Sequence, residues 1–189
     1  LEGATSPFVH DDLANGTCYH YVVTVVTQKG ESLESQEVMA IPSPYLLAMA
    51  FGQEGPDDGE FSSPTGLTLD KDGNIYVADT DNHSIQKFTK DGKFIARWGS
   101  EPSSQEGSFY YPRGLAVGPD DVIYIADSGN NRVQKFDLEG NVMKAWGKFG
   151  FAWRGADMGK FDVPWGITTD QEGNVYVSDT SNARVQKFQ

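Results

Sequence analysis

The segment Asp127-Ser-Gly-Asn-Asn-Arg-Val-Gln-Lys-Phe136 decides the fold, because it has close counterparts at two other places in the chain. DTDNHSIQKF occupies residues 79–88 and DTSNARVQKF occupies residues 179–188, at intervals of 48 and 52 residues. Each copy follows the same lead-in of an aromatic residue, Pro-x-Gly, an apolar run, a turn and a segment that ends in Asp. A repeat of this length indicates a supersecondary unit that stacks on copies of itself.

The composition points to an all-β protein. The chain of 189 residues contains 21 glycines and 12% aromatic residues, and it shows no long amphipathic helical pattern. No apolar run approaches the ~20 residues of a membrane-spanning helix, so we expect no membrane insertion. The net charge of −12 argues against nucleic acid as a partner, because its backbone selects basic surfaces.

Residues 1–42 contain no repeat and are expected to form strands. Tyr19, Tyr21, Val23 and Val25 would share one face of a strand, and residues 37–41 would complete a hairpin. The pattern L-x-x-G-T-x-Y-x-Y-x-V-T-x-V, followed by S-x-E-V-x-A-x-P ending at Pro42, resembles the C-terminal part of a fibronectin type III domain. The resemblance implies the last strands of an immunoglobulin-like β-sandwich, with Tyr19 as its tyrosine-corner residue.

After a linker at residues 43–44, residues 45–189 contain the repeats. Four strands are predicted in each complete repeat, with Gly, Asp and Asn in the turns between them. Phe51-Gly52 stands 47 residues before Trp98-Gly99, which stands 48 before Trp146-Gly147. Residues 45–52 are therefore predicted to be a leading outer strand, followed by blades at about residues 61–99, 109–147 and 161–188.

Four antiparallel strands in roughly 40–50 residues are typical of a β-propeller blade. The motifs Pro-x-Gly-Leu/Ile, Gly-Asn-x-Tyr-Val-Ala/Ser-Asp, Asn-x-Arg-Val-Gln-Lys-Phe and Trp-Gly resemble NHL repeats, with Ser84 in place of the arginine in the first copy. The resemblance implies a propeller of six blades when complete, of which this chain would supply about three. Either further blades belong to a longer parent protein, which we favour, or two copies associate to close a ring.

The repeated polar residues are expected to be structural. Asp79, Asp127 and Asp179 would cap the following turns, and Arg132 and Arg184 would tie one blade to the next. No catalytic residues and no cofactor are predicted, since the three histidines lie apart in the sequence and no nucleophile motif is present. The loose acidic cluster of Asp57, Asp58 and Glu60 is a weak candidate for calcium.

The positions where the repeats differ are the better candidates for binding, because function grafted onto repeats is expected where the copies disagree. Between Pro and Gly at the predicted channel mouth stand Thr65, Arg113 and Trp165. The long loop before Trp165 adds Phe151 and Trp153, which either form a platform for a ligand or pack between blades. These five residues are the candidate ligand-binding residues.

The sequence favours a non-catalytic binding or interaction module for a protein, peptide or carbohydrate ligand. The pairing of the two module types favours a multidomain, bacterial, secreted or cell-surface protein, in which the propeller is tethered to further domains of the same chain. The alternative is part of a metal-dependent lyase or hydrolase propeller, as in the amidating-lyase relatives of this fold, with its site completed by blades outside this sequence.

Overall fold

The computed structural model describes residues 14, 17–21, 26–27, 30–31, 38–40, 48–147 and 158–189. The chain divides into two compact units, Leu1–Ala48 and Met49–Gln189. The predictions for Phe151, Trp153 and residues 45–47 lie outside the described residues. Within the described ranges, no helix is long and apolar enough to cross a membrane.

The described part of the first unit consists of two antiparallel strand pairs. β1 (Tyr19–Tyr21) pairs with β4 (Val38–Ala40), and β2 (Val26–Thr27) pairs with β3 (Gly30–Glu31). Both pairs agree with the predicted hairpin. The Tyr19 hydroxyl accepts a hydrogen bond from the backbone N–H of Ala14 at 2.9 Å, five residues upstream, which is the kind of contact that a tyrosine corner makes.

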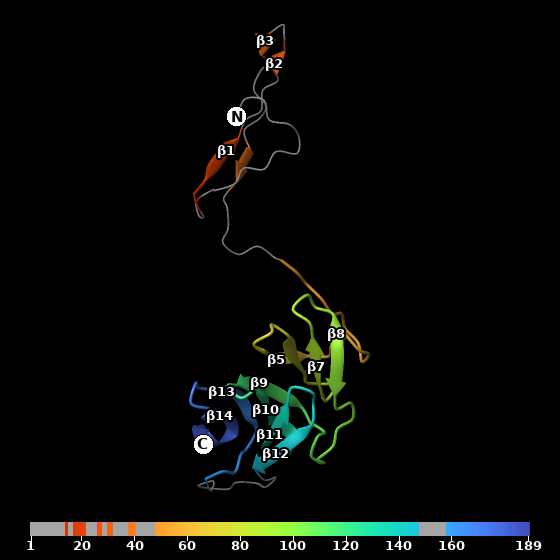
Figure 1. Ribbon diagram of the computed structural model, residues 1–189, viewed down its shortest axis with the longest axis vertical. Coiled ribbons are helices and arrows are strands. Elements are labelled where there is room, and N and C mark those ends of the chain that lie inside the picture. Colours follow the sequence, from red (N-terminus) through yellow and green to blue (C-terminus); the bar gives the residue numbers. More distant parts are fainter. Residues whose placement is uncertain are drawn as a thin grey trace. The chain divides into compact units, whose positions relative to one another are not determined.

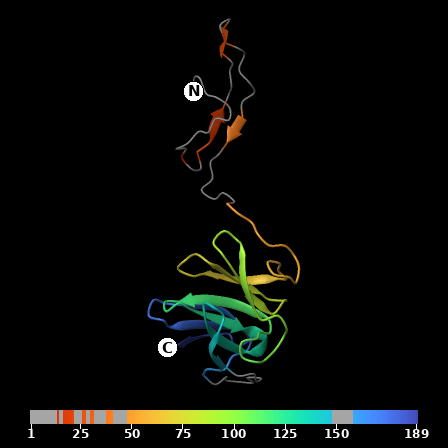
Figure 2. The same cartoon turned by 45° about the vertical axis from the view of Figure 1, so that its right-hand side comes forward.

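The second unit contains three antiparallel sheets, one for each repeat, and Figures 1 and 2 show them following one another in chain order. The first sheet comprises β5 (Pro64–Leu69), β6 (Ile75–Asp79), β7 (Ser84–Phe88) and β8 (Phe94–Trp98). The second comprises β9 (Pro112–Gly118), β10 (Val122–Asp127), β11 (Arg132–Asp137) and β12 (Val142–Gly147). The third comprises β13 (Pro164–Thr169), β14 (Val175–Asp179) and β15 (Arg184–Phe188). The short 3-10 turns η1 (Ser128–Asn130) and η2 (Thr180–Asn182) follow β10 and β14. Strands are hydrogen-bonded in sequence order, so each sheet is a simple meander.

Ala48–Gly52 is not in a strand. The predicted outer strand at residues 45–52 would need the edge of a neighbouring blade to pair with, and the described ranges contain no such partner, so this strand stays a prediction. The side-chain register is nevertheless as predicted. The ring of Phe51 lies 5.0 Å from that of Phe88, as Trp98 lies 5.8 Å from Phe136 and Trp146 lies 5.7 Å from Phe188.

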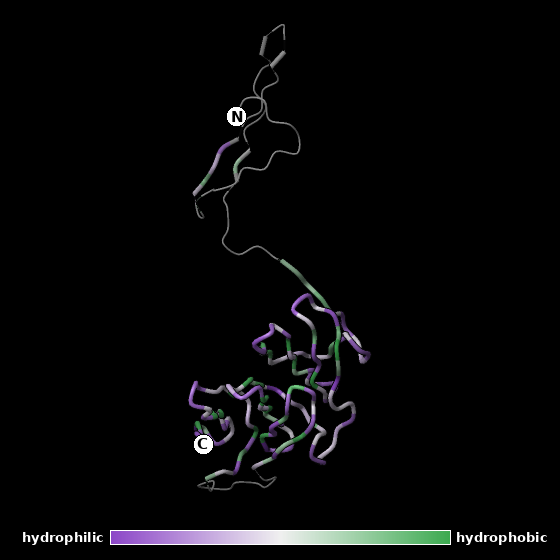
Figure 3. The backbone as a smooth tube through the Cα atoms, viewed as in Figure 1, coloured by the Kyte–Doolittle hydropathy of each residue, from purple (hydrophilic) through white to green (hydrophobic). Residues whose placement is uncertain are grey.

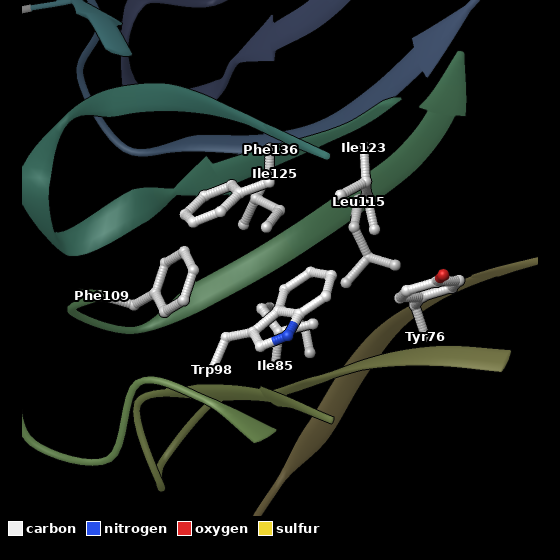
Figure 4. Close-up of a cluster of buried hydrophobic side chains, with 9 residues drawn as sticks. Tyr76, Ile85, Trp98, Phe109, Leu115, Ile123, Ile125 and Phe136 are labelled. Carbon is white, nitrogen blue, oxygen red and sulfur yellow. The ribbon is translucent and has the colours of Figure 1, made fainter. Parts of the chain in front are cut away.

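The core lies between the sheets. Side chains from one face of the first sheet, among them Tyr76, Ile85 and Trp98, pack against side chains of the second sheet (Figure 4). The second group comprises Leu115, Ile123, Ile125 and Phe136 of the second sheet, together with Phe109 of the segment before β9. A second cluster joins the next pair of sheets through Val122, Tyr124, Val133, Phe161, Val175 and Val177. Figure 3 shows the hydrophobic residues concentrated along the strands, with hydrophilic residues in the turns.

The outer faces of the first and third sheets expose residues whose counterparts are buried between sheets. Leu67 is 71% exposed, whereas its counterpart Leu115 in the second repeat is 5% exposed. At the other end Val185 is 68% exposed, whereas its counterpart Val133 is fully buried. Each end of the stack therefore presents the same kind of apolar surface that joins the sheets internally.

Candidate ligand-binding face

The repeated aspartates are buried acceptors that hold the chain segment leading into each sheet. Oδ1 of Asp127 accepts the backbone N–H of Tyr110 at 2.8 Å, and Asp79 and Asp179 accept those of Ser62 and Asp162 at 2.6 and 2.7 Å. Oδ2 of each aspartate accepts the side-chain amide of the Asn three residues on and that of the Gln seven residues on. Because the same contacts to the backbone and to neighbouring amides recur in all three repeats, the role of these aspartates is structural, as predicted.

Two details of that prediction are corrected. Asp127 and Asp179 make no side-chain cap to the 3-10 turns that follow them, because their oxygens are engaged by the preceding segment. Arg132 binds Asp127 of its own repeat at 2.6 Å and the backbone carbonyls of Ser104, Gln105 and Ser108. The arginine therefore clamps the connection that enters its own sheet, rather than reaching the next one.

The surroundings of Asp127 have opposing effects on the pKa of its carboxyl group. Burial raises the pKa of the carboxyl, while the N–H of Tyr110, the amide of Asn130 and the guanidinium of Arg132 favour the charged form. A buried carboxylate that is paired and hydrogen-bonded on both oxygens is a stable arrangement, but one that depends on every partner.

We use the term loop face for the side of the second unit that carries the segments before β5, β9 and β13 and the turns after β6, β10 and β14. Antiparallel pairing places these together, since Pro64 lies opposite Asp79 and Pro164 opposite Asp179. Hydroxyl groups join neighbouring repeats here. Oγ1 of Thr80 donates to the carbonyl of Pro112 at 2.8 Å, and Oγ of Ser128 donates to that of Pro164.

The three channel-mouth candidates lie at equivalent positions on this face and contact one another in sequence. The Thr65 hydroxyl oxygen lies 2.7 Å from the hydroxyl oxygen of Thr80 and 3.2 Å from the backbone carbonyl oxygen of Arg113. The Arg113 guanidinium carbon lies 3.7 Å from the ring centroid of Trp165, which is a close cation–π stack. Trp165 remains 45% exposed, so the stack meets solvent.

Glycines allow the inner strands to come this close. A Cβ on Gly66 would lie 2.1 Å from the carbonyl oxygen of Arg113, and one on Gly114 would lie 2.3 Å from that of Trp165. Any side chain would push the strands apart. The Pro-x-Gly motif thus fixes the variable residue of each repeat next to that of the following repeat.

A second group of exposed aromatic side chains was not predicted from the sequence. The rings of Tyr110 and Tyr111 lie 4.7 Å apart, and the His83 ring lies 5.4 and 4.6 Å from them. The backbone N–H of Tyr111 donates to Nδ1 of His83 at 3.2 Å. A signal was present, because Tyr-Tyr stands where the other repeats have Ser62-Ser63 and Asp162-Val163.

The acidic cluster is occupied by internal contacts. The carboxylate of Glu60 accepts the side-chain amide of Gln53 and the backbone N–H of Asp57, and these hydrogen bonds lower its pKa. Asp58 lies 3.2 Å from Arg97. Among the described residues, no three His, Cys, Asp or Glu side chains gather to hold a metal ion.

Stacked antiparallel sheets, one per repeat, define a β-propeller type of protein, and the three sheets fit a partial propeller. The sequence model of the NHL repeat matches residues 61–88, 109–136 and 161–188. The chain therefore contains three NHL repeats, as the motifs predicted.

Similar proteins share these repeats. Protein lin-41 of Caenorhabditis elegans is 45% identical over 49 residues, which are 26% of this chain and 4% of the relative. E3 ubiquitin-protein ligase TRIM71 of Bos taurus is 45% identical over 49 residues, which are 26% of this chain and 6% of the relative. This chain thus spans only a small part of either relative.

A solved structure is similar over more of the chain. It is a structural genomics protein of unknown function from Bacteroides thetaiotaomicron, 25% identical, with a TM-score of 0.57 over 68% of this chain and 36% of that chain. The two relatives are animal proteins, whereas the solved structure is of a bacterial protein. The bacterial origin of the present chain therefore stays a prediction. The fibronectin type III assignment of residues 1–42 also stays a prediction.

Proposed function

We propose that the NHL repeats are a non-catalytic interaction module that binds a protein or peptide on the loop face. The observations that carry the proposal are the Arg113–Trp165 stack and the exposed pair Tyr110 and Tyr111, which precede Arg113 closely in the chain. Tyrosine, tryptophan and arginine are the residues most enriched at binding hot spots. They stand where the repeats differ, whereas the residues that recur are used by the fold. The name of TRIM71, a ubiquitin-protein ligase, implies protein partners for that relative and supports this choice.

Selection of peptides from a displayed random library of twelve-residue sequences tests the proposal. Trp165→Thr introduces into the third repeat the residue that the first repeat has at this position. The double variant Tyr110→Ser/Tyr111→Ser likewise introduces into the second repeat the two serines of the first. Each variant therefore carries side chains that the fold already accepts at that position. Selected peptides are expected to bind either variant about tenfold or more weakly, as loss of a hot-spot aromatic does.

Met143 supplies the matched control. It is an exposed apolar residue on β12, away from the loop face, and Met143→Ser is expected to leave binding unchanged. Thermal unfolding of each variant checks that the fold is intact. Peptides that bind the wild type and the Trp165→Thr and tyrosine variants equally, or a library that yields no binder, would contradict the proposal.

The organisation of the whole protein is also proposed. The exposed apolar ends at Leu67 and Val185 support a ring of more than three blades, six by the family resemblance, completed by the parent chain or by a second copy. The Tyr19–Ala14 contact supports a fibronectin type III part before the repeats. The pairing of these modules supports an extracellular or cell-surface setting. Light scattering of the full chain distinguishes a monomer from a ring-closing dimer.

A glycan ligand and the metal-dependent lyase or hydrolase alternative stay predictions. Aromatic faces such as Trp165 also suit sugar rings, so a glycan array is the companion to the peptide selection. No observation in the described residues favours either over a peptide.

A further inference from the structure

The four arginines in the described part of the repeats divide into two groups. Arg97, Arg132 and Arg184 each donate to backbone carbonyls, and each lies near an aspartate. Arg113 is different. Its side chain takes part in no hydrogen bond or ion pair within the described residues, and its Nε is buried without a partner. Its one strong contact is the stack on Trp165.

The backbone that carries this guanidinium and its stacking partner is closely packed. The Thr65 hydroxyl lies 3.2 Å from the Arg113 carbonyl oxygen, and the strand of Trp165 closely approaches that of Arg113 at Gly114. A guanidinium stacked on an indole loses little further freedom when it binds a ligand, since its plane is already set. Its unpaired donors are therefore prepared for an acceptor that none of the described residues supplies.

The chemistry of that acceptor follows from geometry and charge. A planar guanidinium pairs best with a carboxylate or a phosphate, through two parallel hydrogen bonds. Of the three segments before β5, β9 and β13, those at residues 53–63 and 100–111 contain six acidic residues and no basic one, namely Glu54, Asp57, Asp58, Glu60, Glu101 and Glu106, while the third, at residues 148–163, has three basic and two acidic residues, so the three together are acidic. Such surroundings repel a polyanion. They favour a ligand with a single negative group in a neutral or basic context.

We propose that the peptide bound on the loop face carries one carboxylate, from Asp, Glu or a C-terminus, which the Arg113 guanidinium binds while Tyr110 and Tyr111 contact the flanking residues. This inference rests on the proposed function and adds the ligand class. Single-stranded RNA is the competing ligand, because phosphates pair with arginine and bases stack on aromatic rings. The charge of −12 and the acidic segments disfavour it.

The experiment uses the full chain and the displayed library of twelve-residue peptides. Wild type, Arg113→Gln and the control Lys144→Gln, which removes an exposed charge on β12, are used in parallel selections. Peptides selected on the wild type and on the control are expected to share one acidic position, and those selected on Arg113→Gln to lack it. Arg113→Lys keeps the charge without the planar fork and should retain part of the preference.

A double-mutant cycle, which combines Arg113→Gln with a change in a synthetic peptide, completes the test. Replacing the selected Glu by Gln, or Asp by Asn, should weaken binding to the wild type about tenfold or more, as expected for a charge-assisted pair. The same change should have almost no effect on binding to Arg113→Gln. If the selected peptides present a free C-terminal carboxylate instead, amidation of that C-terminus replaces the Glu→Gln or Asp→Asn change.

The outcomes separate the two proposals. Peptides that depend on Trp165 but are indifferent to the Glu→Gln change would overturn the carboxylate inference and leave the proposed function standing. Absence of any peptide whose binding depends on Trp165 or on the Tyr110 and Tyr111 pair would overturn both. A random single-stranded RNA pool that binds the wild type, displaces the peptides and fails on Arg113→Gln would assign the guanidinium to phosphate instead, and so overturn the inference.

Discussion

In the first and second repeats, an arginine donates to equivalent backbone carbonyls of the loop before the sheet, but the arginine comes from a different strand in each repeat. In the second repeat, Arg132 on β11 donates to the carbonyls of Ser104 and Gln105 at 2.8 and 2.7 Å. Ser84 stands at the equivalent position of the first repeat, and its buried hydroxyl has no hydrogen-bond partner.

In the first repeat the guanidinium belongs to Arg97 on β8, at the position that Ala145 occupies in the second repeat. Arg97 donates to the carbonyls of Pro56 and Asp57, which lie 48 residues before those of Ser104 and Gln105. The comparison shows that the connection needs a donor for its carbonyls, because buried backbone acceptors are costly when unpaired. It does not need the donor to come from a particular strand.

The two arrangements differ in what they do to the buried aspartate. Arg132 binds both the loop and Asp127, whereas Arg97 binds the loop and lies near the exposed Asp58. Among the described residues, Asp79 accepts hydrogen bonds from a backbone N–H and two side-chain amides, all neutral. The second repeat thus contains a buried ion pair that the first lacks.

The largest expected effect comes from removing the two aspartates in turn. Asp127→Ala leaves the Arg132 guanidinium buried without its counter-charge and should lower the free energy of unfolding by ~3–5 kcal/mol. Asp79→Ala leaves only neutral donors unpaired and should cost about 1–3 kcal/mol. Urea unfolding, followed by tryptophan fluorescence, measures both. Equal losses for the two variants would show that the ion pair adds nothing to the second repeat.

The next effect tests whether the two sources of the guanidinium are interchangeable. Arg97→Ala should cost about 1–2 kcal/mol through the two unpaired carbonyls. Ser84→Arg alone should also destabilise, since its guanidinium would meet a loop that Arg97 already occupies.

The double variant Ser84→Arg/Arg97→Ala rebuilds the second repeat's arrangement in the first. It should be more stable than the sum of the two single changes by roughly 1–2 kcal/mol, within the range seen for residues that share partners. The reverse swap, Arg132→Ser/Ala145→Arg, is a stricter control because it also removes the partner of Asp127. Additive single effects would contradict the interchange.

A smaller effect is expected where the repeats join. His83 and its counterpart Asn131 both have positive φ, near 53°, and both accept a backbone N–H of the following repeat, from Tyr111 and Val163. His83→Asn should therefore change stability by less than ~0.5 kcal/mol, because asparagine tolerates this conformation.

His83→Val should cost about 1–2 kcal/mol in comparison, since it removes the acceptor and places a β-branched residue at positive φ. The free energy of unfolding is again the measured quantity. His83→Ala, which removes the acceptor but is not β-branched, separates the two causes. If His83→Asn were as damaging as His83→Val, the imidazole would have a role beyond that of an acceptor.

Much of the fold could be predicted from the sequence because the repeats test one another. The strands of the three sheets lie within the predicted blades, at residues 64–98, 112–147 and 164–188, and the Phe51 ring packs on Phe88 in the way that its alignment with Trp98 predicted. The outer strand at residues 45–52 stays a prediction, because alignment of a motif fixes where a side chain packs, while a strand also needs a partner edge.

The site was less predictable for a physical reason. Variation between copies pointed to Thr65, Arg113 and Trp165, which the structure brings together. It equally marked Tyr110 and Tyr111, but the clustering of these rings with His83 depends on a contact between repeats that no single repeat encodes. The sequence also did not reveal that Arg97 replaces the arginine missing at position 84. The two positions lie on the neighbouring strands β8 and β7, so an alignment of the repeats does not match them.

The smallest effect concerns the turn between the first two strands of each repeat. Asp170 accepts the side-chain amide and the backbone N–H of Asn174, the hydroxyl of Tyr176 and the N–H of Glu172, and these bonds lower its pKa to about 2. In the corresponding turn of the second repeat, Gly118 replaces the aspartate. A carboxyl whose pKa is lower in the folded chain stabilises the fold at pH values above its unfolded pKa, 3.8. That contribution is lost as the pH falls from about 4 to about 2.

Asp170→Asn should therefore lower the urea midpoint slightly at pH 5, and the difference from the wild type should vanish near pH 2. Asp120→Asn changes an exposed carboxylate in the turn of the second repeat and is measured in parallel as the matched control. A difference that stays constant with pH would mean that Asp170 acts through the shape of its hydrogen bonds and not through its charge. The glycine of the second repeat would then be the better guide to what this turn requires.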